Sequence, residues 1–345
     1  MAYTTIDNPE LYFQTKLYTG NGSTQSITGV GFQPDWCWLK SRAGDNVSNH
    51  RSVDSVRGAT KELFQDATSA EETNTNGLTA FNSNGFSLGS SGGTNNSNTT
   101  YASWNWKAGG TASSNTDGSI TSTVSANTTA GFSIVSFTGT AANATVGHGL
   151  GVAPACFITK SRVNAENWGF YHQSLGNGKQ LELNTTAAQK TSSAYYNNTS
   201  PTSTVFSIGT ADSTNDNQNM ICYCFAEKKG YSKFGSYTGN GNADGTFVYT
   251  GFKPSLVIAK SSSASHDWII LDNKRSNPFN PVDGNLFPNN TDAEGTATKR
   301  FDFTSQGFKN RSAGTGANES GTTYIYMAFA ENPFVTSSGV PTTAR

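Results

Sequence analysis

Charged residues are scarce in this sequence. Asp, Glu, Lys and Arg make up 14% of its 345 residues, and the formal net charge is −1, whereas about a quarter of the residues of an ordinary globular protein are charged. Nucleic-acid binding requires a basic surface, and electrostatic attachment to a membrane requires clusters of Lys and Arg. The composition therefore argues against both of these partner classes.

Long apolar segments and an export signal are also missing. No window approaches the ~18 continuous apolar residues of a membrane-spanning helix, so we expect no membrane insertion. Residues 1–7 contain neither the basic nor the apolar region of a secretory signal. We therefore expect the chain to be made in a cytoplasm and to remain there, or to leave inside an assembled particle. The cysteines are expected to be buried free thiols: Cys37, Cys156, Cys222 and Cys224.

Patterns that carry catalysis or metal binding are few. The sequence contains no His-x-x-x-His pair and no Asp-x-Asp-x-Asp calcium loop. The glycine-rich stretch around His148 lacks the lysine of a phosphate-binding loop. The sequence therefore predicts no catalytic residue, no cofactor, no metal and no enzymatic activity. The other histidines are His50, His172 and His266.

One enzymatic alternative stays open. Glycan-processing enzymes use two carboxylates about 5–9 Å apart, and a sequence cannot measure that separation. The available carboxylates include Asp54, Asp66, Glu182, Asp272, Asp283 and Glu294.

A phrase of twelve residues occurs three times, and it organises the rest of the chain. Each copy holds a proline followed six residues later by a lysine, and an aromatic-Thr-Gly phrase precedes each proline by 16 or 17 residues. Such self-similarity indicates one structural unit used three times. The lysines are 120 and then 100 residues apart, which places an insertion between the first and second copies. The copies are Gly31–Arg42, Gly151–Arg162 and Gly251–Ser262.

Each copy is expected to form a unit of short antiparallel strands. The apolar runs after the proline predict strands buried on both faces, and no segment has helical periodicity. The predicted fold is all-β: three tandem, jelly-roll-like β-sandwich units. We expect the first unit to stand apart from a tight pair formed by the other two. The boundaries are 1–110, a linker hairpin at 111–131, 132–230 and 231–345.

Two sets of residues are candidates for contacts. The repeated lysines Lys40, Lys160 and Lys260 suit either a ligand or subunit contact or the polar end of a strand, where lysine also prevents edge pairing. We favour the second reading. The neighbouring tyrosines Tyr195 and Tyr196 lie in a Ser/Asn/Thr stretch without a strand pattern. Exposed tyrosines stack on sugars and anchor protein contacts, so this pair is a candidate receptor contact. Turn packing is the alternative.

Several longer phrases resemble a repeat family of tailed-bacteriophage structural proteins, especially from marine and cyanobacterial phages, that are described as tail fibres or tail spikes. The resemblance extends from Asn8 to Phe334. The phrases are Asn8–Gln14, Asp54–Phe64, Trp104–Gly110, Gly147–Gly151 and Tyr326–Phe334.

The resemblance implies a virion protein assembled in the host cytoplasm and contributing to host attachment. It implies as partners copies of the same chain, with a trimer favoured, other virion proteins, and a glycan or protein of the host surface. A head decoration protein is the alternative within the same class.

Overall fold

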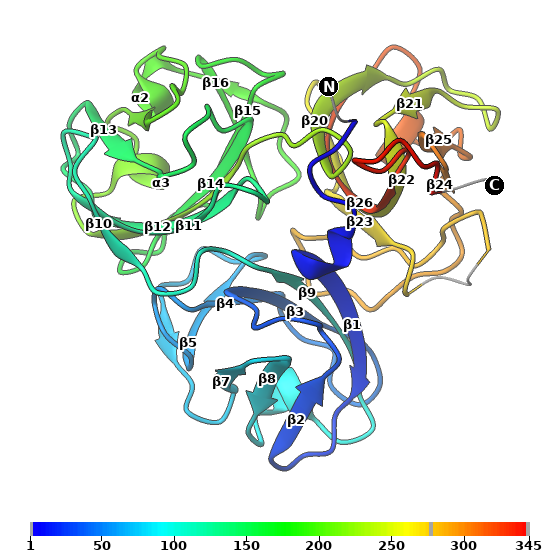
Figure 1. The fold of residues 1–345 in the computed structure, drawn as a ribbon, viewed down its shortest axis with the longest axis horizontal. Helices are drawn as coiled ribbons and strands as arrows, with labels where there is room; N and C mark the ends of the chain where they lie inside the picture. Colours follow the sequence, from blue (N-terminus) through cyan, green and yellow to red (C-terminus); the bar gives the residue numbers. More distant parts are fainter. Residues whose placement is uncertain (1–2, 276–278, 343–345) are drawn as a thin grey trace.

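The computed structural model describes residues 3–275 and 279–342. Three β-sheet units surround a common centre (Figure 1). All strand pairs of the named sheets are antiparallel, and the described helices are three or four residues long, so the predicted all-β class is confirmed. These helices are η1 (Pro9–Leu11), α1 (Gly92–Asn95), α2 (Ser193–Tyr196), α3 (Asp212–Asn215) and α4 (Thr315–Asn318).

The first unit combines a large sheet of order β1-β9-β3-β4-β5-β6 with a small sheet of order β2-β8-β7. The predicted strand after Gly31 is present as β3. The strands are β1 (Phe13–Thr19), β2 (Gln25–Thr28), β3 (Trp36–Ala43), β4 (Arg51–Asp54), β5 (Lys61–Phe64), β6 (Glu72–Thr73), β7 (Leu78–Asn82), β8 (Gly85–Leu88) and β9 (Thr100–Trp106).

The second unit has a large sheet of order β10-β11-β12-β19-β14-β15-β16-β17 and a small sheet of β13 and β18. Residues 111–131, expected to form a linker hairpin, contain β10 and β11, which pair with each other and extend this sheet through β12. The strands are β10 (Ser113–Asn115), β11 (Ser122–Asn127), β12 (Phe132–Thr138), β13 (Ala144–Gly147), β14 (Cys156–Ser161), β15 (Gly169–His172), β16 (Lys179–Glu182), β17 (Lys190–Thr191), β18 (Val205–Ile208) and β19 (Asn219–Phe225).

The third unit has a large sheet of order β20-β26-β22-β23 and a small sheet of order β21-β25-β24. The order β1-β9-β3-β4 of the first unit therefore recurs as β12-β19-β14-β15 and β20-β26-β22-β23. A repeated unit would produce this recurrence, and the repeat itself remains a prediction. The strands are β20 (Ser232–Thr238), β21 (Phe247–Tyr249), β22 (Phe252–Ser261), β23 (Ile269–Asp272), β24 (Phe301–Thr304), β25 (Gly307–Asn310) and β26 (Thr323–Pro333).

Each large sheet is buried on both faces. One face packs on the small sheet of its own unit, where three separate apolar clusters form around Val53, Phe157 and Val257. The other faces of the three large sheets meet in a single cluster. Because alternate residues of a strand point to opposite faces, nearly continuous apolar runs such as Trp36–Leu39 supply both clusters at once.

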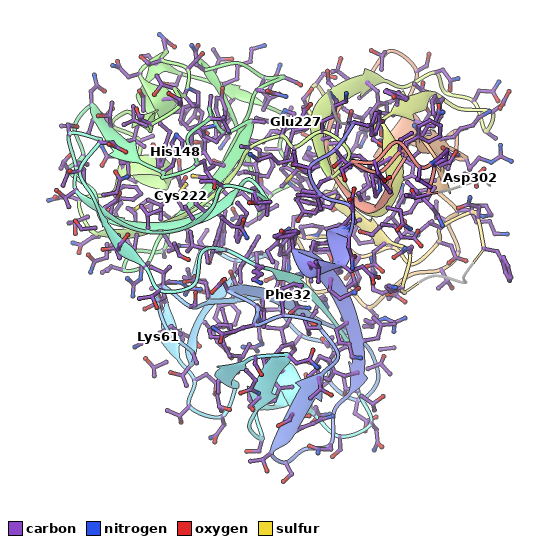
Figure 2. All side chains as sticks on the ribbon, in the orientation of Figure 1. Phe32, Lys61, His148, Cys222, Glu227 and Asp302 are labelled. Carbon is purple, nitrogen blue, oxygen red and sulfur yellow. The ribbon has the colours of Figure 1, made fainter. Side chains whose placement is uncertain are left out.

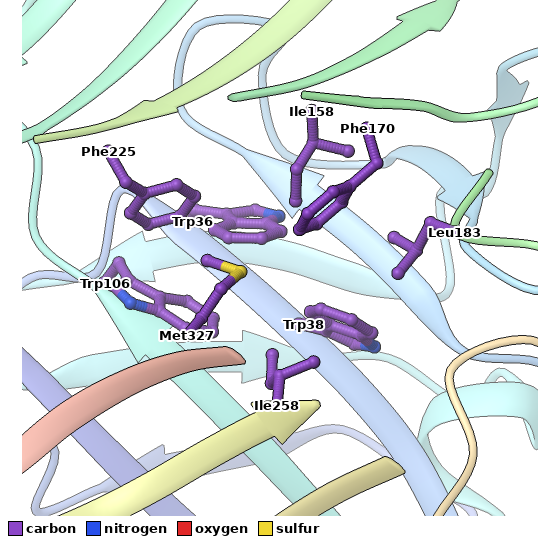
Figure 3. A pocket seen from close by; sticks show the side chains of 9 residues that line it. All are labelled: Trp36, Trp38, Trp106, Ile158, Phe170, Leu183, Phe225, Ile258 and Met327. Atoms are coloured by element: carbon purple, nitrogen blue, oxygen red, sulfur yellow. The ribbon is translucent and has the colours of Figure 1, made fainter. Parts of the chain in front are cut away.

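The side chains of the shared cluster come from all three units (Figure 3). Trp36 stacks on Trp106 of its own sheet at 4.5 Å and on Tyr223 of the second unit at 4.2 Å between ring centroids. Met327 of the third unit and Phe225 of the second line the same space, which has no room for a water molecule. The expectation that the first unit stands apart is therefore wrong: the three units share one core.

A buried asparagine ends a one-turn helix in each unit. Its side-chain amide donates to two loop carbonyls; for Asn215 these belong to Ala142 and Gly209, both at 2.6 Å. Its side-chain oxygen accepts from a backbone N–H of the turn after the unit's first strand, here Thr140 at 2.8 Å. Asn95 and Asn318 make the equivalent contacts. These asparagines therefore hold the polar loops of each unit in place.

Replacing Asn215 by aspartate should destabilise the second unit by about 2–4 kcal/mol, since the new carboxylate would face two carbonyls without a proton to donate. Urea unfolding measures the change. Asn197→Asp, on an exposed position, is the matched control and should stay within ~0.5 kcal/mol. Equal effects of the two substitutions would contradict a structural role for Asn215.

Candidate functional site

The predicted receptor tyrosines occupy different environments. Tyr196 is fully buried, packs edge-on against Phe157 and Tyr171, and donates a hydrogen bond to Gln180 Oε1 at 3.1 Å. It cannot meet a receptor, so the prediction is wrong for this residue, because α2 turns its side chain into the sandwich core. Tyr195 is half-buried at the edge of the same core, and its receptor contact remains a prediction.

The repeated lysines are buried rather than placed at the ends of edge strands. Lys40, Lys160 and Lys260 are at most 1% exposed, and each lies on a strand with neighbours on both sides. Burial lowers the pKa of each ammonium group to about 8. The expectation that these lysines prevent edge pairing is therefore wrong.

Each lysine Nζ donates instead to loop carbonyls. Lys40 reaches Thr291 of the third unit at 3.1 Å, and Lys260 reaches Thr186 of the second at 3.1 Å. Lys160 donates to Ser161 and Asn164 of its own unit. At least two of the three lysines thus join neighbouring units of one chain.

Three histidines are buried: His50, His148 and His172. His172 accepts from the backbone N–H of Ser174 at Nδ1 and lies 3.1 Å from the Tyr326 carbonyl through Nε2. These partners require a neutral ring protonated at Nε2. Burial lowers the pKa of His172 to about 4. The contact with the Tyr326 carbonyl connects the second unit to the third.

His172 should make the protein less stable in acid. Its folded-state pKa lies below the ordinary value near 6.5, so its contribution is complete above pH 6.5 and is lost as the pH falls toward 4. The loss amounts to about 3 kcal/mol on this shift. Urea midpoints measured from pH 7.5 to 4.5 should fall more steeply for the wild type than for His172→Asn. Identical slopes would contradict the assignment.

The first unit lacks the tryptophan that precedes β15 and β23 in the other units. Strand register places His50 at the position of Trp168 and Trp268. The Trp168 and Trp268 indole nitrogens donate to carbonyls of Phe64 and Glu182 in the preceding unit. His50 Nδ1 instead accepts from Trp38 Nε1 of its own unit at 2.9 Å, so the exchange changes a buried contact and not the surface.

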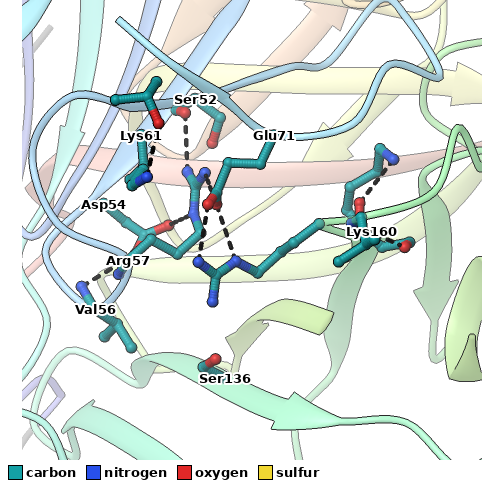
Figure 4. A network of polar contacts seen from close by, with 12 residues as sticks. Ser52, Asp54, Val56, Arg57, Lys61, Glu71, Ser136 and Lys160 are labelled. Atoms are coloured by element: carbon teal, nitrogen blue, oxygen red, sulfur yellow. Dashed lines mark hydrogen bonds and ion pairs between the residues drawn. The ribbon is translucent and has the colours of Figure 1, made fainter. Parts of the chain in front are cut away.

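Buried ion pairs connect the first unit to the second (Figure 4). Arg57 is fully buried and donates to Asp54 Oδ2 at 2.6 Å and to Glu71 Oε2 at 3.0 Å. Glu71 also pairs with Arg162 of the second unit at 2.9 Å. The Tyr223 hydroxyl, again from the second unit, donates to Asp54 at 2.7 Å.

The same arrangement connects the third unit to the first. Arg275 joins Asp272 at 2.5 Å and Glu294 at 2.8 Å, and Glu294 pairs with Arg42 of the first unit. Trp104 Nε1 donates to Asp272 at 2.9 Å, in the role that Tyr223 has at the other junction. The carboxylates Asp54, Asp272 and Glu294, which were candidates for a glycan-processing pair, are therefore held in ion pairs at these junctions.

The remaining candidates are placed as follows. Glu182 pairs with Lys190 at 2.7 Å, and burial raises the pKa of Asp66 to about 6 beside Asn49. Asp283 lies in the loop before β24. The residues that the structure describes hold no group of three or more His, Cys, Asp or Glu side chains able to bind a metal ion. The four cysteines are free and buried, as predicted.

A cleft of about 470 Å³ lies where the first unit joins β11. The Asp35 carboxylate in its wall accepts from Ser55 Oγ at 3.0 Å and from the Ala108 N–H at 2.8 Å. Burial raises the pKa of Asp35. Because one oxygen binds Ser55 and the other binds the Ala108 backbone, Asp35 fixes the segment that follows β9.

Exposed aromatic rings gather on the small sheet of the third unit. Phe247 and Tyr249 on β21 are 47% and 56% exposed, while Val248 between them is buried. Equivalent register positions carry Ser26 and Thr28 in the first unit; in the second they carry Thr145 and Gly147. This face, where the third unit differs from the other two, is the candidate functional site.

Comparisons with known proteins identify one family. A family model described as "Domain of unknown function (DUF7483)" matches residues 8–333. No curated protein and no solved structure matches the chain. Among the described residues no helix is both long and apolar enough to cross a membrane.

Proposed function

The chain belongs to the DUF7483 family, and we propose that it is a non-enzymatic structural protein of a tailed-bacteriophage virion. Its role is that of a tail-fibre or tail-spike component in host attachment. The sequence resemblance supplies the class of particle. The structure supports a scaffold role, because lysine, arginine, carboxylate and histidine side chains are buried in contacts between the units.

The observation that carries the proposal is that buried charged and histidine side chains lie at the contacts between units. Lys40 and Lys260 donate to loops of a neighbouring unit. The arginine–carboxylate pairs and His172 also contact a neighbouring unit. A network of this kind fixes three sandwiches in one orientation around a shared core. The outer faces and loops are then free to differ, as the exposed face of β21 does.

Virion appendages commonly form closed homo-oligomers, and a trimer is part of the proposal. One chain has a mass of 36.5 kDa, so light scattering should give a mass near three times that value.

Labelling of purified particles with antibody against this chain tests the location. Electron microscopy should place the label on the tail. Label on the capsid shell would favour the decoration alternative and contradict attachment, while unlabelled particles would contradict virion association altogether. A fall in polysaccharide viscosity after mixing with the protein would contradict the non-enzymatic reading.

A further inference from the structure

The outer face of the third unit's small sheet carries two aromatic rings in a polar frame. Residues directly opposite on antiparallel strands share a face, so one row contains Phe247, Lys309 and Asp302, and the next contains Tyr249, Gly307 and Thr304. Asp302 lies on the side of this unit that points away from the molecular centre (Figure 2). We call these six residues the aromatic face.

The geometry of β21 aims both rings the same way. Residues two apart on a strand point to one side and lie about 7 Å apart. Gly307, opposite Tyr249, has no side chain to cover that ring. The ring is also held at its far end, because Tyr3 donates to the Gly251 carbonyl at 2.5 Å and lies next to the Tyr249 hydroxyl. Both rings therefore face solvent, and the Tyr249 ring is also held at its hydroxyl end.

The two charged residues of the aromatic face, Lys309 and Asp302, each pair with an oppositely charged residue beside the face. Lys309 forms an ion pair with Asp244, and Asp302 pairs with Arg311 at 3.3 Å. These side chains keep hydrogen-bonding atoms near the rings while their charges compensate one another. Such a surface favours an uncharged ligand with many hydroxyl groups over an anion or a cation.

The exposed apolar area is small. At 47% and 56% exposure, the two rings offer together roughly 200 Å², given about 200 Å² for a whole aromatic side chain. A stable protein interface buries about 800 Å² on each partner. The face is therefore too small to hold a protein by apolar contact, and its size matches one or two sugar rings.

We propose that the aromatic face binds a neutral hexose-containing polysaccharide, with pyranose rings stacked on Phe247 and Tyr249. The apolar C–H faces of the sugar lie on the aromatic rings, and its hydroxyl groups meet Thr304, Lys309 and Asp302. This assignment deepens the proposed function, on which it rests for one point, that the polysaccharide belongs to a host surface.

Saturation-transfer NMR with soluble hexasaccharides tests binding without a virion. The probes are neutral gluco-, manno- and galacto-hexasaccharides, and at least one should receive saturation from the wild-type protein. The variant Phe247→Ser/Tyr249→Thr introduces the residues that the first unit has at the equivalent positions. It should bind that probe about tenfold more weakly or worse. Phe247→Tyr/Tyr249→Phe keeps both rings and should retain binding.

Two controls separate loss of the site from loss of fold. The thermal midpoint of the Ser/Thr variant should stay within ~3 °C of the wild type, since both side chains are exposed. Tyr195→Ser, in the second unit, should leave saccharide binding unchanged.

Absence of binding to every hexasaccharide, or equal binding by the Ser/Thr variant, would overturn the proposal. Loss of binding in Tyr195→Ser alone would also overturn it and place the sugar in the second unit. None of these results depends on where the protein sits on a particle, so labelling of virions judges the proposed function separately.

Discussion

Replacing Trp36 by alanine is expected to reduce the free energy of unfolding by about 3–5 kcal/mol, the usual loss for a large buried aromatic side chain. Trp36 is 2% exposed and stacks on rings from two units, and its Nε1 donates to Ser52 Oγ at 2.7 Å. Removal of the indole opens a cavity where three sheets meet. Guanidinium unfolding followed by circular dichroism measures the change.

A graded variant and the shape of the transition sharpen this test. Trp36→Phe keeps a stacking ring and loses the hydrogen bond, so it should cost about 1–2 kcal/mol. Calorimetry of the wild type should show one cooperative transition, because the large sheets share their core. Two separated transitions, or a loss below ~1 kcal/mol in Trp36→Ala, would contradict a common core.

The strands could be predicted from local patterns, whereas the arrangement of the units could not. Continuous apolar runs such as Cys156–Ile158 indicate strands buried on both faces, and β14 has this character. The sequence does not state what covers the second face. The longer insertion before the second unit suggested separation, yet β10 and β11 add to the second sheet and the first unit joins the shared core.

For the polar residues too, the sequence shows a pattern, and only the structure shows the contacts that explain it. The repeated lysines were visible as a pattern, but their role depends on carbonyls from distant loops, such as Thr291 for Lys40. Tyr196 was misplaced because a single helical turn carries no periodicity. Phe247 and Tyr249 could not be singled out from the sequence, because only strand register places Ser26 and Thr28 of the first unit at their positions.

Replacing Arg57 by methionine is the second substitution with a large expected effect, a loss of about 3–5 kcal/mol. The guanidinium has no exposed surface and satisfies Asp54, Glu71 and the Ser52 carbonyl. Methionine fills much of the volume but leaves the Asp54 carboxylate buried without its cation. Arg275→Met should cost a similar amount, since Arg275 meets Asp272, Glu294 and the Ile270 carbonyl in the same way.

The double variant Asp54→Leu/Arg57→Met separates two effects on the free energy of unfolding: the cost of leaving one charge unpaired and the net contribution of the ion pair. With no uncompensated charge left, it should be more stable than Arg57→Met alone. Lys233→Met disrupts a half-exposed pair with Glu227 and should change stability by less than ~1 kcal/mol. If Arg57→Met costs no more than Lys233→Met, the buried ion pairs do not hold the junction, and the shared apolar core alone must orient the three units.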